Sequence, residues 1–410
     1  MNYSRRRMLG GLCSLPLLAA DMKLNLVADE RARGTLPDKA SFPFDGVYLD
    51  AAFTHPMSVA TRSSYIEYLK HRVVDDTRIG PSNNAHDLAV RLYAKLINAD
   101  PTDIAVVPST MEGENLIAAS LGLNQTAGAV TDALHYDGSL VLYGELAKRG
   151  MPLKVVAPRV GGIDLADVEA AIGKDTRLIA VSLVSATTGF QYDLKALVEL
   201  AHSKGAFVYA DIIQAAGAVP VDVKASGVDF CSCGCYKWLM GDFGAAFLYV
   251  RPDRLPNLKR TQVGWRQVRR QATHVFPFDA PGSALGEWTL GSDTASMFEV
   301  STPAWGSLAC VAESLAYIES VGVEAIMRHR KPLIDRLWEV LPKRGFEPLT
   351  PPESAGPIVV FAYRDAAARF GKALHDAKIQ ISTYANRIRV SPSVYNDMDD
   401  VEKLLRVLQT

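Results

Sequence analysis

The sequence predicts an α/β protein with a mostly parallel sheet covered by helices and a smaller α+β lobe toward the C-terminus. From Tyr48 onward, short β-rich runs alternate with amphipathic helical stretches. Such alternation indicates parallel strands joined by helices that cover both faces of one sheet. After Arg251 the alternation loosens, and beyond about residue 300 helices mix with only short strand-like runs. Two structural parts of unequal size are therefore expected.

The larger part contains a series of strand predictions, made from short runs rich in β-branched and apolar residues. They cover residues 104–108, 128–131, 153–157, 178–184, 206–210, 228–233 and 245–250. Helices are predicted over residues 110–121, 165–172 and 194–204. Asp164 is a suitable N-cap for the second helix, and apolar residues follow one face of the third. Ligands of such sheets bind beyond the carboxyl ends of the strands.

The smaller part begins with two predicted helices, over residues 305–320 and 324–341. A proline-rich connector at 348–352 precedes the remaining elements. These are strand-like runs at 358–361, 379–381 and 388–390, and helices at 366–377 and 399–408. We expect an export signal over residues 1–20, an N-terminal segment at 21–60 that contributes to the small lobe and the active-site mouth, a large domain at 61–300 and a small domain at 301–410.

Composition excludes several classes of protein. The chain has 410 residues, of which 48% are apolar and 22% are charged, a balance typical of globular proteins. The net charge of −1 gives no electrostatic support for nucleic-acid binding. Beyond residue 20 there is no apolar run of about 18 residues, so no stable membrane anchor is expected. Five cysteines are too few for a disulfide scaffold, and the alternation of Cys231, Cys233 and Cys235 is typical of a strand and not of a metal site.

The N-terminus has the layout of an export signal. Three arginines, Arg5 to Arg7, precede an apolar stretch that ends in small residues at Ala19 and Ala20. The paired arginines resemble a twin-arginine signal, although Met8 and Gly10 depart from its pattern. We therefore expect a periplasmic or secreted protein, with a cytoplasmic protein carrying a basic tail as the alternative.

Three features fall in order at the ends of predicted strands. Ser109 and Glu112 fit a capping box at the start of a helix, where free backbone N–H groups suit an anion such as phosphate. Asp211 closes the strand at 206–210, and Lys237 follows the strand at 228–233 between two aromatic residues. Burial would lower the pKa of this lysine and make its amine a better nucleophile toward a carbonyl. Taken singly, each feature is also explained by a helix cap, a strand-end cap or a solvated lysine.

Taken together, the three features match the handling of pyridoxal phosphate. A helix start would hold the phosphate, Asp211 would keep the ring nitrogen protonated, and Lys237 would bind the aldehyde as a Schiff base. Because parallel strands end at the same edge of a sheet, the 26 residues that separate Asp211 from Lys237 can place both side chains at one rim.

Four ordered blocks resemble the class V aminotransferase family of fold-type I pyridoxal-phosphate enzymes, which includes cysteine desulfurases, kynureninases and isopenicillin N epimerase-like proteins. The blocks are Tyr48-Leu-Asp-Ala-Ala52 with Pro56, Asp211-Ile-Ile-Gln214 with Pro220-Val-Asp222, Tyr236-Lys237-Trp238-Leu239 with Gly244, and Arg389-Val-Ser-Pro-Ser-Val-Tyr395-Asn396. The resemblance runs from about Tyr48 to Leu408 and implies a seven-stranded sheet of that fold type.

The resemblance also implies roles for further residues. Thr110 and the Met111 amide match the phosphate-binding turn, His135 matches the residue that stacks on the pyridine ring, and Gln214 matches the group that hydrogen-bonds the phenolic oxygen. Thr302 matches a threonine that reaches the phosphate of a neighbouring subunit, which implies a homodimer. Arg389 is the preferred residue for the substrate α-carboxylate because a guanidinium can bind a carboxylate with two hydrogen bonds. Arg387 and His55 are further candidates for substrate binding.

The expected activity is pyridoxal-phosphate chemistry at Cα of an amino acid or primary amine, through Lys237 as the catalytic residue. Amino transfer is preferred as the generic activity of this fold, and elimination by a lyase or epimerisation stays open. The last cysteine is Cys310, so the C-terminal lobe lacks the loop cysteine with which a cysteine desulfurase takes up sulfur. On that ground we expect no persulfide chemistry. No metal site is expected.

Overall fold

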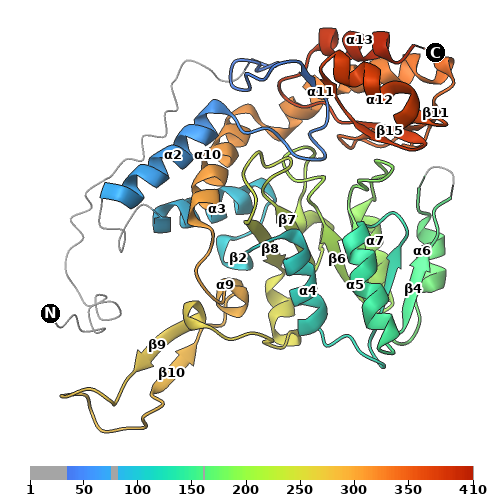
Figure 1. The fold of residues 1–410 in the computed structure, drawn as a ribbon. Helices are drawn as coiled ribbons and strands as arrows, with labels where there is room; N and C mark the ends of the chain where they lie inside the picture. Colours follow the sequence, from blue (N-terminus) through green and yellow to red (C-terminus); the bar gives the residue numbers. More distant parts are fainter. Residues whose placement is uncertain (1–34, 75–81, 160–161, 410) are drawn as a thin grey trace. The chain divides into compact units, whose positions relative to one another are not determined.

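A seven-stranded sheet forms the centre of the computed structural model, which describes residues 35–74, 82–159 and 162–409. The strand order is β2–β8–β7–β6–β5–β3–β4 (Figure 1). Within this sheet only β8 runs antiparallel to its neighbours, so the prediction of a mostly parallel sheet is confirmed. The strands are β2 (Ile104–Val107), β3 (Gly128–Asp132), β4 (Leu153–Val156), β5 (Thr176–Ser182), β6 (Phe207–Asp211), β7 (Phe230–Gly234) and β8 (Ala246–Val250).

Apolar residues cover both faces of the sheet. In β5, Ile179 and Val181 belong to one core cluster, whereas Leu178 and Ala180 belong to another. Successive side chains of a strand point to opposite faces, so the two clusters lie on opposite sides of the sheet. One cluster includes α3 (Ser82–Leu96), α7 (Leu194–Ser203) and α10 (Trp305–Val321), and the other includes α4 (Thr110–Ser120), α5 (Asp137–Lys148) and α9 (Thr294–Phe298).

Local sequence signals place the helix starts. Asp164 caps α6 (Leu165–Ala171) by accepting a hydrogen bond from the Ala166 amide, as its sequence position predicts. Ser109 caps α4 in the same way, with its Oγ 3.0 Å from the Glu112 amide nitrogen. Each cap satisfies a backbone N–H that the helix itself leaves without a partner. The cap at Ser109 positions the candidate site, because it fixes the start of α4 at the edge of the sheet.

A second, antiparallel sheet lies in the C-terminal part, in the order β11–β12–β15–β14. Its strands are β11 (Glu347–Pro348), β12 (Val359–Ala362), β14 (Ser382–Tyr384) and β15 (Arg387–Val390), and they share a core with α11 (Val323–Val340), α12 (Ala366–Asp376) and α13 (Met398–Val407). The N-terminal strand β1 (Val47–Tyr48) pairs in parallel with β13 (Ile379–Gln380). Residues from both ends of the chain therefore meet in this part.

Several elements were not predicted from sequence. They are α2 (Val59–Val74), α3, α5 and a hairpin of β9 (Val268–Ala272) and β10 (Glu287–Leu290) that projects from the lower left in Figure 1. The hairpin strands are mostly polar and exposed, so they lack the apolar alternation that signals a half-buried strand. The expected export signal at 1–20 lies outside the described residues and stays a prediction. Among the described helices, none has the length and apolar character that a membrane span requires.

Candidate active site

Lys237 lies just beyond the carboxyl end of β7, in a turn in which the Met240 amide donates to the Lys237 carbonyl oxygen at 2.8 Å. The lysine is 9% exposed. Gly217, in the loop after β6, has a φ of +87° and approaches so closely that an added Cβ would lie 2.4 Å from the Trp238 carbonyl oxygen. Glycine is needed there because other residues rarely adopt this conformation and none would fit. The close loop keeps the lysine turn buried.

The Lys237 amine has no hydrogen bond or ion pair with any described residue; its recorded neighbour is the Tyr236 ring, whose centroid is 5.7 Å from Nζ. Burial lowers the pKa of Lys237 to about 8, and the nearby Arg389 guanidinium acts in the same direction. Asp211 opposes this shift because its negative charge favours the ammonium form. A buried, unpaired amine that is substantially neutral near pH 8 is suited to nucleophilic and base chemistry.

Asp211 ends β6 beside β7, so parallel pairing brings it to the same sheet edge as Lys237. One carboxylate oxygen accepts a hydrogen bond from the Ile213 amide at 2.9 Å, and the other has no described partner. Burial raises the pKa of Asp211 to about 6. The Ile213 amide and the His135 and Lys237 charges oppose this rise, whereas Glu114 adds to it. The free oxygen can accept a hydrogen bond from a protonated nitrogen of a ligand.

Replacing Asp211 by asparagine is expected to stabilise the cofactor-free protein by about 1–3 kcal/mol near pH 7, because the buried carboxylate has a pKa of about 6 instead of 3.8. At a pH below 3.8 the aspartate is neutral in both folded and unfolded chains, so the advantage vanishes. It grows as the pH rises toward 6 and is constant above that value. Denaturant unfolding of both proteins at acid and neutral pH measures the difference. Equal stabilities of the two proteins at neutral pH would show that folding does not raise the pKa of Asp211.

The start of α4 lies next to these two residues. Thr110 is buried, and its Oγ1 accepts a hydrogen bond from the Gly234 amide, at the end of β7, at 2.8 Å. The Thr110 hydroxyl hydrogen remains available to a ligand. The Thr110 and Met111 amides have no described hydrogen-bond acceptor, and they stand at the positive end of an 11-residue helix. This arrangement suits an anion.

His135 follows β3 and is buried at the same sheet edge. Its Nε2 lies 3.0 Å from a carboxylate oxygen of Glu114, and its Nδ1 lies 2.8 Å from Ser182 Oγ. Burial by itself lowers the pKa of His135, but the carboxylates of Glu114, Asp211 and Asp132 together raise it, so the net shift is upward. Sequence reasoning missed Glu114, because a glutamate in a helix usually faces solvent. The helix spacing could have placed Glu114 in the site, since it is one turn from Thr110 and so lies on the same helix face.

Gln214 is also buried, but both ends of its amide have protein partners. Its Nε2 donates to the Ala52 carbonyl oxygen at 3.0 Å, and its Oε1 accepts from Trp238 Nε1 at 2.8 Å. The amide thereby ties the N-terminal segment to the residue that follows Lys237. One hydrogen of the Nε2 group remains free for a further acceptor.

Arg389, on β15, is 5% exposed and reaches the same region from the C-terminal part. Its Nη2 lies 3.3 Å from Asp50 Oδ1 and 2.9 Å from Ser382 Oγ, and its Nη1 lies 3.2 Å from the Ala186 carbonyl oxygen. Its Nε is buried and has no partner. An unpaired N–H on a buried guanidinium is costly unless a ligand accepts it, as a carboxylate would.

The other predicted residues occupy different settings. Both ring nitrogens of His55 have partners, Nδ1 with the Pro56 carbonyl oxygen and Nε2 with Ser393 Oγ, each at 2.8 Å. Burial lowers the pKa of His55 to about 4, so the ring is neutral. Arg387 stacks over the Tyr384 ring at 4.2 Å. Thr302 is exposed, as contact with another subunit would require. Their predicted roles remain predictions.

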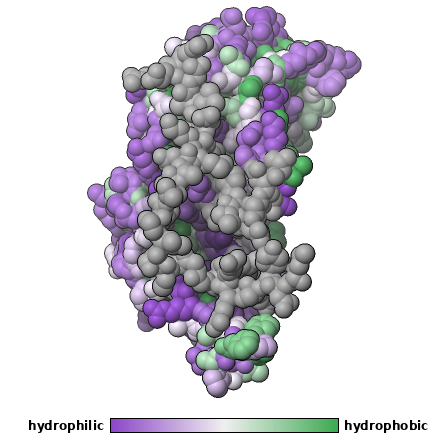
Figure 2. All heavy atoms as spheres, turned by 90° about the vertical axis from the view of Figure 1, so that its left-hand side faces the viewer, coloured by the Kyte–Doolittle hydropathy of each residue, from purple (hydrophilic) through white to green (hydrophobic). Residues whose placement is uncertain are grey.

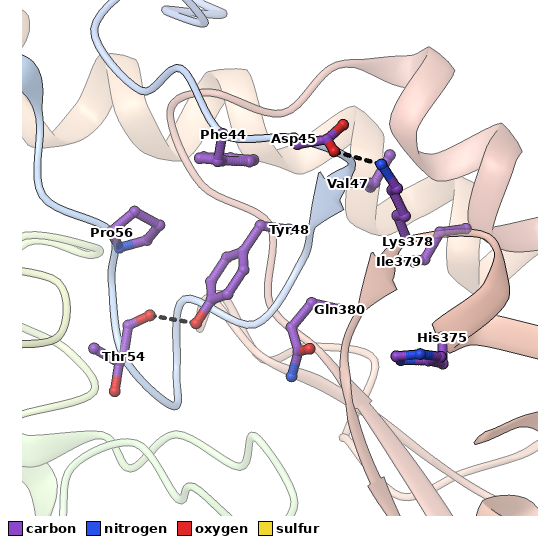
Figure 3. A pocket seen from close by; sticks show the side chains of 10 residues that line it. All are labelled: Phe44, Asp45, Val47, Tyr48, Thr54, Pro56, His375, Lys378, Ile379 and Gln380. Atoms are coloured by element: carbon purple, nitrogen blue, oxygen red, sulfur yellow. Dashed lines mark hydrogen bonds and ion pairs between the residues drawn. The ribbon is translucent and has the colours of Figure 1, made fainter. Parts of the chain in front are cut away.

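A cavity of about 510 Å³ opens between the N-terminal segment and the C-terminal part (Figure 3). Tyr48 forms one wall, where its hydroxyl donates to the Thr54 carbonyl oxygen at 2.7 Å, and an ion pair of Asp45 and Lys378 lies at another side. Burial raises the pKa of Tyr48 to about 12, and Asp50 adds to that rise. The cavity wall therefore adjoins the Asp50–Arg389 pair.

The described cysteines are all buried. Cys231 and Cys233 lie in β7, Cys235 follows it and Cys310 lies in α10. Burial raises the pKa of each thiol above its usual range. A thiol that is buried and protonated is a poor nucleophile. These four side chains are part of the protein core.

Comparisons with known proteins agree with this architecture. A family model described as aminotransferase class-V matches residues 47–404. An uncharacterized aminotransferase, YcbU, from Bacillus subtilis is 28% identical over 75% of this chain and 79% of its own length. A probable cysteine desulfurase from Methanothermobacter thermautotrophicus is 27% identical over 72% of both chains. The cysteine desulfurase IscS from Shewanella sediminis is 26% identical over 65% of this chain and 70% of its own.

Solved structures with the same fold include the cysteine desulfurase CsdA from Escherichia coli, with a TM-score of 0.79 and 20% identity over 91% of this chain and 98% of that one. The cystine C–S lyase C-DES, in complex with its reaction product cysteine persulfide, has a TM-score of 0.77 and 20% identity over 91% of this chain and 99% of that one. The pyridoxal-phosphate fold type I predicted from sequence is thereby confirmed.

These relatives correct one expectation. The sequence reasoning preferred amino transfer and excluded persulfide-forming cysteine desulfurases, because no cysteine follows Cys310. That assignment is wrong, since the relatives and the neighbouring structures are chiefly cysteine desulfurases. The error lay in treating a cysteine on the enzyme as a requirement of the reaction, when the product named with C-DES carries the persulfide on free cysteine.

Proposed function

Because this chain belongs to the aminotransferase class-V family of pyridoxal-phosphate-dependent enzymes, we propose that it is a cysteine desulfurase-type enzyme that cleaves the carbon–sulfur bond of cysteine. The observation that carries this proposal is the buried, unpaired Lys237 amine beside Asp211, with an arginine nearby that can hold a substrate carboxylate. The choice of substrate rests on the desulfurases among the relatives.

The site offers an unsatisfied group for each part of the cofactor. Free amides and the Thr110 hydroxyl suit the phosphate, the unpaired Lys237 amine suits the aldehyde, and the free oxygen of Asp211 suits a protonated ring nitrogen. Lys237 and Asp211 are buried, and unsatisfied polar groups there are unfavourable unless a ligand completes them. The residues present therefore fit pyridoxal phosphate.

When bound, the cofactor supplies an electron sink for the bond broken at the substrate. Asp211 keeps that sink effective by holding a proton at the ring nitrogen. Arg389 binds the α-carboxylate through its unpaired Nε and orients Cα toward Lys237. With a pKa lowered to about 8, Lys237 Nζ takes a proton from Cα and later returns one. Cleavage at Cβ then releases the substrate sulfur.

The sulfur requires an acceptor thiol. Within the part of the chain that the structure describes, all four cysteines (Cys231, Cys233, Cys235 and Cys310) are buried, so we propose that the acceptor is a small external thiol. The overall reaction balances as cysteine plus a thiol giving alanine plus a persulfide: the Cβ–S bond breaks, one S–S bond forms, and the thiol hydrogen accounts for the new C–H bond.

A direct assay tests this proposal. The enzyme loaded with pyridoxal phosphate is expected to convert cysteine to alanine in the presence of a small thiol, with persulfide or sulfide formed in equal amount. The Cys310→Ser variant is the matched control and should retain the activity, because its thiol is buried in α10. Transfer of the amino group to a keto acid without release of sulfur would contradict the proposal.

We further propose a homodimer in which the hairpin and Thr302 lie against a second copy of this chain. Large apolar side chains are exposed around the hairpin loop, among them Val275, Phe276, Phe278 and Leu285. Figure 2 shows apolar residues gathered at the lower end of one face, where the hairpin lies. Clustered apolar exposure of this kind typically marks an interaction surface. Thr302, which is also exposed, would then reach the phosphate bound by the second copy.

Replacing both Phe278 and Leu285 by glutamate is expected to convert the dimer to a monomer, as measured by light scattering on a sizing column. Two added charges per copy would be desolvated on association, which opposes it strongly. Val141→Glu, at an exposed apolar position in α5, is the control and should leave the mass unchanged. A wild-type protein with the mass of a single chain would contradict the proposed dimer.

A further inference from the structure

Glu114 is a buried acid within the candidate site that the proposed mechanism does not use. It lies on α4, one helical turn beyond Thr110, and is 1% exposed. One oxygen is 3.0 Å from His135 Nε2, and the other accepts a hydrogen bond from Ser139 Oγ at 2.5 Å. No lysine or arginine pairs with it among the described residues. A buried carboxylate persists only where a positive or proton-donating partner compensates its desolvation.

His135 is held from both sides. Nε2 faces the Glu114 carboxylate, and Nδ1 faces the Ser182 hydroxyl at 2.8 Å. The acidic groups that act on the ring come from three elements or their ends: Glu114 of α4, Asp132 of β3 and Asp211 of β6. Lys237 acts on Asp211 from the turn after β7, and Tyr209 of β6 and Tyr143 of α5 lie close to Glu114. Several acids therefore surround one imidazole.

We propose that Glu114 is a positioning residue that keeps a proton on Nε2 of His135 and fixes the plane of its ring. An ionised carboxylate is an acceptor only, so Nε2 must be the donor in this pair. The ring then has one fixed tautomer when neutral and both nitrogens protonated when charged. This inference rests on the proposed function and on the predicted stacking of His135 on the cofactor ring, and it assigns the residue that sets the protonation state of that histidine.

The arrangement has a consequence for Asp211. Burial opposes ionisation of that carboxylate, and a positive charge on His135 favours it. Glu114 therefore acts on Asp211 in two opposite ways: it favours the charged form of His135, which in turn favours ionisation of Asp211, whereas its own negative charge opposes that ionisation.

The test uses the full-length enzyme loaded with pyridoxal phosphate and labelled with ¹⁵N in its histidine rings. We expect the His135 signal, assigned with the His135→Gln variant, to show a protonated Nε2 throughout the neutral range. In Glu114→Gln, the His135 pKa should fall by about one to three units, as loss of an adjacent opposite charge predicts. Glu112→Gln, on the same helix two residues away, is the matched control and should leave the titration unchanged, since the Glu112 side chain has no described hydrogen-bond partner.

Three results would overturn the proposal. One is a His135 titration that is the same in the wild type and in Glu114→Gln, and another is an equal shift in the Glu112→Gln control. The third needs no variant: wild-type spectra that show Nε2 without its proton in neutral solution. None of these readouts depends on turnover of cysteine, so failure of this proposal is separable from failure of the proposed reaction.

Discussion

The Lys237→Ala variant is expected to lose activity by about a thousand-fold or more, because one side chain supplies both the attachment point and the base. The surrounding structure explains why another lysine cannot take over. Lys237 is buried at the sheet edge next to Asp211, and burial lowers its pKa to about 8. The loss should appear in kcat, since the variant leaves Arg389, the residue proposed to bind the substrate carboxylate, unchanged.

The conversion of cysteine by the purified variant measures this effect. Lys331→Ala is the matched control, because Lys331 is an exposed lysine on α11 whose partner among the described residues is Asp335. It should retain full activity. An alanine variant at position 237 that retained a tenth of the wild-type rate would show that the amine is not the reacting group.

The Arg389→Ala variant is expected to lower kcat/KM by about 100-fold or more, mainly by raising KM, because it removes the buried guanidinium that we propose binds the substrate carboxylate. The same change leaves Asp50 buried without its cation. Asp50 is 2% exposed, and burial raises its pKa while Arg389 lowers it. Removal of one partner of a buried pair costs about 3–5 kcal/mol of stability. Two effects of different origin are thus expected from one substitution.

The double variant Arg389→Ala/Asp50→Asn separates these effects. A neutral amide in place of the unpaired carboxylate should restore part of the lost free energy of unfolding. It should not restore the KM for cysteine, because no guanidinium returns. Steady-state kinetics and denaturant unfolding of the three proteins give both quantities. Recovery of KM in the double variant would show that Arg389 acts on stability and not on the substrate.

Much of the fold follows from patterns that the chain displays locally. Strand–helix alternation predicts the parallel sheet because a buried parallel strand is a continuous apolar run, as in the centre of β5. The same reasoning places Asp211 and Lys237 at one edge, since β6 and β7 are parallel neighbours that end there. The hairpin of β9 and β10 could not be predicted in this way, because its residues are exposed and contribute little to a core.

The candidate site is less visible in the sequence because its contacts join distant residues. Glu114 meets His135 across 21 residues, and Arg389 meets Asp50 across 339, so neither pair leaves a local signal. The class of reaction is even harder to predict from the sequence. Lys237 and Asp211 serve any reaction that begins at Cα, and the choice among transfer, elimination and sulfur release depends on the substrate. Cysteine position in the chain proved a misleading guide to that choice.

The central claim is that Lys237 carries the cofactor, and one measurement tests it directly. Enzyme purified with pyridoxal phosphate is reduced with borohydride, digested and analysed by mass spectrometry. We predict that the peptide containing Lys237 gains the mass of one reduced cofactor and that the Lys237→Ala protein gains none. A native protein that leaves this peptide unmodified, or carries the group on a different lysine, would contradict the account.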